Sequence, residues 1–184
     1  MTTLYENQLH EPIGPFASFF CILDKKKQGF LTPDVLYSFI LEQSADLSLS
    51  FVQKKYLMLL IKKGLTKIQP HPEGHITIED ILCYAQRLLT FFCGSEVHNP
   101  QQCLLLSQEM FRKIGPVHQS IRHSQLCQHI TQKFPALTPN KRILAHILTQ
   151  ILLLFCSQTK DGSISEKRWT DTALALYFEL YNHR

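Results

Sequence analysis

The chain has no uninterrupted hydrophobic run long enough to cross a membrane. Its longest apolar stretch, residues 147–156, is broken by Thr149 and Gln150 and is shorter than the roughly 20 residues that a bilayer requires. The N-terminus has neither the basic and apolar segments of a secretion signal nor the Met-Gly start of a myristoylated protein. We therefore expect no membrane span and a cytoplasmic location.

The sequence also lacks the short motifs that mark common active sites. It contains no GxSxG turn, no phosphate-binding P-loop, no HExxH motif and no dinucleotide fingerprint. We therefore expect no catalytic residues and no cofactor. An enzyme or an enzyme-modulating factor, such as a secreted effector, is the alternative interpretation, because folding can bring together residues that are distant in sequence.

Basic residues outnumber acidic ones, with 19 Lys and Arg against 15 Asp and Glu and a formal net charge of +4. They form no long stripe interleaved with aromatic residues, so we expect no nucleic-acid partner. The run Lys25–Lys27 is interpreted as a solvated loop.

Six cysteines are present, and no two of them form a CxxC pair. Most fall on the apolar faces of expected helices, where a free thiol packs as a small hydrophobic group. We expect reduced thiols in the core, and a zinc site shared with histidines is the alternative. The six are Cys21, Cys83, Cys93, Cys103, Cys127 and Cys156.

Apolar residues recur at spacings of three and four along most of the chain, which predicts an all-α protein of eight helices. Pro33 suits the first turn of the second helix, and Thr138-Pro139 is typical of the start of the seventh. The polar segment 93–100 predicts a boundary between two lobes, residues 1–93 and residues 100–184. The expected helices include residues 16–23, 36–40, 52–60, 81–89, 104–114, 126–130, 143–155 and 169–180.

Each pair of expected helices encloses a loop that contains an aliphatic residue, and these residues recur about every 45 positions, as repeated units do. They are Leu31, Ile76, Ile121 and Ile164. The first unit has a Phe-rich helix, Asp24 at the loop start, Gly29 at the sixth loop position and Leu31 at the eighth. It resembles the first EF-hand of calmodulin-like proteins.

The resemblance implies four degenerate EF-hand-like helix–loop–helix units, paired into two lobes. In that family the eighth-position residues of paired loops join through a short β-bridge, so Leu31 is expected to pair with Ile76 and Ile121 with Ile164. An ordinary helical bundle with no such ancestry is the alternative.

The loops lack the ligands that calcium needs, which in an EF-hand come from positions 1, 3, 5, 7, 9 and 12, with a bidentate glutamate at position 12. In the first loop Asp24 occupies position 1, but Lys26 and Val35 occupy positions 3 and 12. The fourth loop has Asp161 at position 5 and Arg168 at position 12, and the third has no carboxylate. We therefore expect no calcium binding and no metal cofactor.

The second loop is lengthened and has Asp80 at position 12. It also contains His71, Glu73 and His75, which could bind zinc, although four ligands cannot be assembled from the sequence. We interpret these as exposed loop residues. The same interpretation applies to the histidines around the third loop, His118, His123 and His129.

The resemblance, together with the missing calcium ligands, implies a calcium-independent, calmodulin-like interaction module of the adaptor or light-chain type. We expect its partner to be an amphipathic or apolar segment of another protein. The chain has 12 Phe but only three Met, which favours a shape-specific pocket over a soft one. A purely structural helical protein is a further alternative. The expected groove residues are Phe19, Leu36, Phe39, Ile40, Ile151, Phe155, Leu176 and Tyr177.

Overall fold

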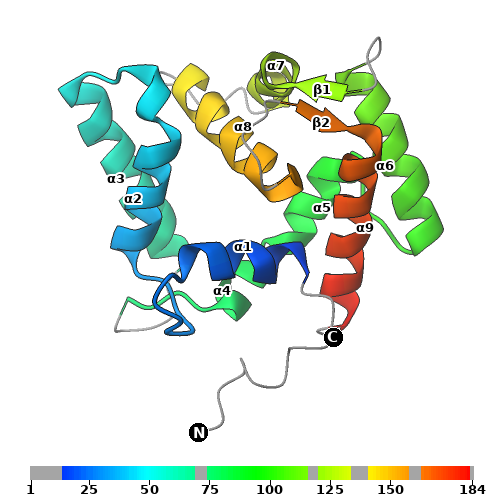
Figure 1. The fold of residues 1–184 in the computed structure, drawn as a ribbon, viewed down its shortest axis with the longest axis horizontal. Helices are drawn as coiled ribbons and strands as arrows, with labels where there is room; N and C mark the ends of the chain where they lie inside the picture. The colour runs from blue at the N-terminus through cyan, green and yellow to red at the C-terminus, as the bar shows by residue number, and fades with distance from the viewer. Residues whose placement is uncertain (1–13, 69–73, 116–119, 134–140, 158–162, 183–184) are drawn as a thin grey trace, which may run out of the picture.

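A computed structural model describes residues 14–68, 74–115, 120–133, 141–157 and 163–182, and this part of the chain is mostly helical (Figure 1). The prediction of a helical protein is confirmed at this level. The elements are α1 (Pro15–Leu23), α2 (Pro33–Gln43), the 3-10 turn η1 (Ala45–Leu47), α3 (Phe51–Ile68), α4 (Ile78–Leu82), α5 (Ala85–Cys93), α6 (Pro100–Ile114), β1 (Ser120–Arg122), α7 (His123–Lys133), α8 (Lys141–Ser157), β2 (Ser163–Ser165) and α9 (Glu166–Asn182).

Both predicted loop pairings are confirmed. Strands β1 and β2 form an antiparallel ladder in which Ile121 lies opposite Ile164. Leu31 and Ile76 form an isolated bridge, in which the Leu31 amide donates to the Ile76 carbonyl at 2.8 Å and the Ile76 amide donates back at 2.9 Å. All four side chains are buried, so each pairing joins two loops and also contributes to a core.

The larger core lies among α5, α6, α7, α8 and α9. At its centre Trp169 is fully buried, and its ring lies 4.4 Å from that of Phe92. The Trp169 indole N–H also donates to the Phe92 carbonyl at 3.2 Å. This hydrogen bond satisfies the polar atom of a large buried side chain, and it attaches α9 to the end of α5.

The prediction of one continuous helix over residues 81–89 is wrong, because the structure divides this segment into α4 and α5. A turn at Cys83 and Tyr84 separates the two, with the Tyr84 amide donating to the Ile81 carbonyl. The break lets the two helices take different partners: α4 packs against α1, whereas α5 packs against α6 and α9.

Segment 93–100 forms a packed elbow between α5 and α6. Gly94 ends α5 with φ of +79°, and Asn99 caps α6 by accepting a hydrogen bond from the Gln102 amide at 2.8 Å. Val97 is buried, and the Tyr177 hydroxyl donates to the His98 carbonyl at 3.3 Å. The expected lobes, residues 1–93 and 100–184, therefore share core contacts through α5.

A smaller core joins α1, α2 and the turn before α4. Its buried members are Phe20, Leu23, Leu31 and Ile76. Helices α2 and α3 lie together at one side of the molecule, and α1 runs beneath them toward α9 (Figure 1). Among the helices that the structure describes, none is long and apolar enough to cross a membrane.

Two loop glycines have positive φ, +78° at Gly29 and +72° at Gly74. Glycine adopts this conformation at little cost because it has no Cβ atom. The expected helix start at Thr138-Pro139 lies outside the described residues. Pro33 is at the first turn of α2 as predicted, with Thr32 at the N-cap.

Candidate interaction site

In the first loop, the carboxylate at the loop start accepts hydrogen bonds from loop amides. Asp24 is buried, and its two oxygens accept the Gln28 amide at 2.9 Å and the Gly29 amide at 2.7 Å. Each oxygen of Asp24 therefore accepts one backbone N–H group of the loop that follows it. Lysines 25–27 are exposed, as predicted, and Lys27 has φ of +52°.

In the second loop, Asp80 stabilises a helix start. Its carboxylate accepts a hydrogen bond from the Thr77 amide at 2.8 Å, and the Thr77 hydroxyl accepts one from the Asp80 amide. These two hydrogen bonds form a capping box at the start of α4. His75 stacks on Phe30, with ring centroids 3.8 Å apart. His71 and Glu73 lie outside the described residues. Among the residues that are described, no three His, Cys, Asp or Glu side chains gather as metal ligands.

The expected groove residues from both halves of the chain meet at one place. Phe19 of α1 lies 5.5 Å from Phe39 of α2 and 5.9 Å from Phe155 of α8, measured between ring centroids, and both contacts are edge-to-face. Phe155 also contacts Phe16 at 5.3 Å. We call Phe19, Phe39 and Phe155 the aromatic junction. Leu36, Ile40 and Ile151, on the same helices, are half-buried.

Two of the expected groove residues do not offer an accessible surface in this structure. Leu176 is fully buried, and Tyr177 is 7% exposed. Both belong to the larger core, because α9 packs against α5 and α6 along this side. The helical pattern alone could not distinguish this face of α9 from a groove, since either would be apolar.

Glu179, which the sequence pattern did not identify, links α9 to the first turn of α1. Its carboxylate is buried and accepts the Phe16 amide at 3.0 Å and the Ala17 amide at 2.9 Å. A negative charge is favourable there because the first N–H groups of a helix have no partner within the helix. Gly14 lies so close to Glu179 that a Cβ atom would collide with it.

Three histidines of α7 and α8 are half-buried: His123, His129 and His146. The rings of His123 and His146 are 4.6 Å apart, and the Nε2 atoms of His123 and His129 are buried without a hydrogen bond. Burial lowers the pKa of His123, with a further contribution from His146. Burial also lowers the pKa of His129, with a contribution from Lys133. The expectation of exposed loop histidines is therefore wrong for His123 and His129, while His118 lies outside the described residues.

Cys93 and Cys103 form a buried thiol pair at the elbow, with their sulfur atoms 3.8 Å apart. The contact with Cys103 and burial raise the pKa of the Cys93 thiol, so a thiol rather than a thiolate occupies this position. All six cysteines are free, as expected, but Cys21 and Cys83 are exposed rather than in the core.

No protein-family model matches the chain, and no curated protein matches its sequence.

Proposed function

We propose that this chain is a calcium-independent, calmodulin-like protein-interaction module, built from four degenerate EF-hand-like units and acting as an adaptor or light-chain-like subunit in the cytoplasm. The two loop pairings, Leu31 with Ile76 and Ile121 with Ile164, support this EF-hand-like interpretation. The observation that carries calcium independence is the first loop, where exposed Lys26 and Val35 occupy positions at which calcium would need oxygen ligands.

Position 12 of the first and fourth loops supports the same proposal. Calcium requires a bidentate carboxylate there, whereas this chain has Val35 and Arg168, and both side chains are exposed. A loop that needs no ion cannot use the ion to switch its helices from a closed to an open arrangement. We therefore propose that the binding surface is permanently formed.

The proposed binding surface surrounds the aromatic junction. Its accessible members are half-buried side chains of α1, α2 and α8, which remain available to an amphipathic or apolar segment of a partner protein. The surface comprises Phe19, Leu36, Phe39, Ile40, Ile151 and Phe155.

The test is affinity purification from the native cell with matched variants of α2. Ile40→Asp places a charge within the proposed surface, whereas Ser38→Asp places the same charge on a neighbouring exposed position of α2. We expect Ile40→Asp to lose a co-purifying protein at least about tenfold, because burying an unpaired carboxylate opposes binding, and Ser38→Asp to retain it. Both variants should keep the wild-type helicity and melting temperature. Equal recovery of the partner with both variants contradicts the proposed surface.

Calorimetry tests calcium independence separately. We expect no calcium binding tighter than about millimolar, and no rise of the melting temperature with added calcium through ligand linkage. A micromolar site would show that the loop alignment is wrong, without bearing on the aromatic junction.

A further inference from the structure

Helix α3 exposes an unusual amount of apolar surface. Among the described residues, the three most exposed large apolar side chains are all on this helix: Phe51 is 71% exposed, Val52 74% and Leu59 65%. By contrast Leu57, on the other side of α3, is only 3% exposed. Val52 and Leu59 belong to the apolar spacing that predicted this helix, yet no other described element covers them. An exposed apolar face of this kind is typical of a binding surface.

Lysines share this exposed face. Val52, Lys55, Leu59 and Lys62 are separated by three or four residues and therefore lie along one side of the helix. The Lys55 ammonium group lies 4.6 Å from the centroid of the Phe51 ring. The sequence of α3 contains no Asp or Glu, so the face is both apolar and uniformly basic.

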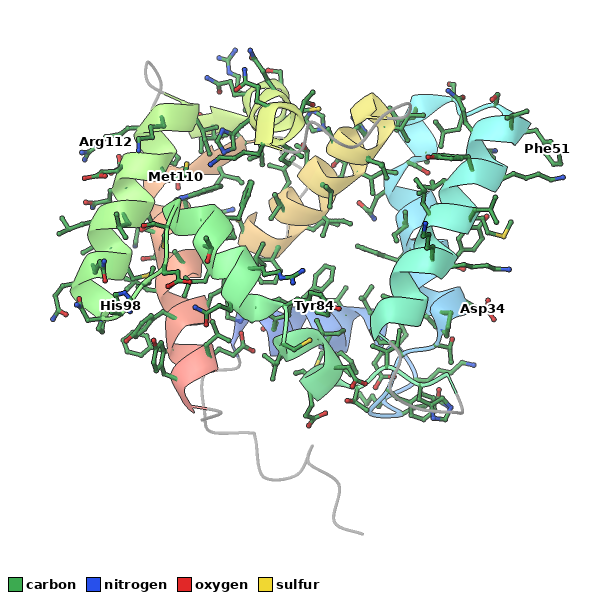
Figure 2. All side chains as sticks on the ribbon, turned by 180° about the vertical axis from the view of Figure 1, so that it is seen from behind. Asp34, Phe51, Tyr84, His98, Met110 and Arg112 are labelled. Carbon is green, nitrogen blue, oxygen red and sulfur yellow. The ribbon has the colours of Figure 1, made fainter. Side chains whose placement is uncertain are left out.

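The position of α3 makes the face accessible to a flat surface. The helix packs mainly against α2, at one side of the molecule (Figure 1). Figure 2 shows Phe51 at the outer edge, whereas the acidic Asp34 of α2 lies near the other end of this helix pair. A planar anionic surface could thus contact the start of α3 without displacing another element.

We propose that α3 is an interfacial helix that rests on an anionic lipid surface. Its lysines would contact lipid headgroups, and Phe51, Val52 and Leu59 would enter the boundary between headgroups and acyl chains. Lysine is depleted at the centre of protein–protein interfaces, whereas at a membrane its stem can lie along apolar surface while its charge reaches the headgroups. A mixed lysine and apolar face therefore fits lipid better than it fits a protein. The inference is independent of the aromatic junction.

Vesicle flotation with the full chain tests the proposal. We expect binding to vesicles that contain about 30% phosphatidylserine, weakening as salt is raised, and no binding to purely phosphatidylcholine vesicles. Lys55→Glu with Lys62→Glu should lower the partition coefficient at least about 25-fold. The control, Lys113→Glu with Lys167→Glu, makes the same change of net charge at exposed positions of α6 and α9, and should lower it by no more than about threefold.

A second set of two double variants tests how much the apolar side chains of α3 contribute to vesicle binding. Val52→Glu with Leu59→Glu should reduce binding at least about tenfold, whereas Leu104→Glu with Leu105→Glu, on exposed positions of α6, should leave it within about threefold. Circular dichroism should show unchanged helicity for every variant, because all these side chains are exposed.

A fluorescent variant reports the contact directly. Phe51→Trp should shift its emission to the blue on anionic vesicles, while the native Trp169 is fully buried and its emission should stay constant. The proposal is overturned by absence of vesicle binding at low ionic strength, or by equal effects of the α3 and control pairs. Binding of an acidic amphipathic peptide through α3, without vesicle binding, would overturn it in favour of a protein partner.

Discussion

The two loop pairings differ in how much structure surrounds them. Ile121 and Ile164 lie within a three-residue ladder and belong to the larger core, whereas Leu31 and Ile76 form one bridge and are two of the four buried residues of the smaller core. The C-terminal pairing is thus part of a well-packed region, while the N-terminal pairing joins α1, α2 and the turn before α4 through fewer buried residues. The aromatic junction includes α2, and the proposed lipid-facing surface lies on α3, which packs mainly against α2. Both surfaces therefore use helices with few buried residues, which fits the general tendency of binding elements to come from the less stable parts of a protein.

The largest expected effect is the removal of Trp169 from the larger core. Trp169→Ala should lower the free energy of unfolding by about 3–5 kcal/mol, because it creates a cavity and leaves the Phe92 carbonyl without its hydrogen bond. Leu31→Ala, in the smaller core, should cost about 2–3 kcal/mol. Urea denaturation followed by circular dichroism measures both, since the chain has one Trp and its fluorescence is lost in the first variant. If Leu31→Ala lowered the free energy of unfolding more than Trp169→Ala did, the N-terminal region would be the better packed of the two.

The link between the two regions depends on Glu179. Glu179→Gln should lower the free energy of unfolding by about 1–2 kcal/mol, because a charged acceptor for the α1 amides becomes neutral. Asp171→Asn, an exposed position on the same helix, is the control and should change it by less than about 0.5 kcal/mol. Similar values for the two variants would mean that the α1 contact contributes little.

Two glycines at positive φ differ in the space that surrounds an added Cβ atom. At Gly29 an added Cβ atom meets nothing within 4 Å, so Gly29→Ala should cost about 1 kcal/mol from backbone strain alone. At Gly94 the same atom would also collide with Met110, so Gly94→Ala should cost about 2 kcal/mol. Chemical denaturation measures the difference, and equal costs would show that Met110 moves aside freely.

The smallest expected effect is a dependence of the free energy of unfolding on pH, caused by His123 in the C-terminal region. The pKa of His123 is lowered in the folded state, so the unfolded state binds more protons once the pH falls below the ordinary histidine value of about 6.5. Stability should therefore decline from that pH downward through the folded pKa. His123→Phe should make the decline shallower when stability is measured by thermal unfolding between about pH 7.5 and pH 5.

Local sequence signals predicted much of the fold. Apolar spacing identified the helices, and the EF-hand resemblance, which rests on the recurring aliphatic residues, predicted which loops pair. The same signals could not reveal the turn at Cys83 and Tyr84, since the apolar stripe continues across it. They also missed Glu179, whose role depends on the amides of a helix 162 and 163 residues away.

The sequence by itself determined that the chain is mostly helical, and the aliphatic residues of its loops, taken with the EF-hand resemblance, predicted the pairing of Leu31 with Ile76 and of Ile121 with Ile164. Only the tertiary structure decided which apolar faces are buried. It placed Leu176 in the core and Leu59 in solvent, although both lie on comparable helical stripes. The reason is that periodicity records which side of a helix is apolar, whereas burial depends on whether another element is present to cover that side.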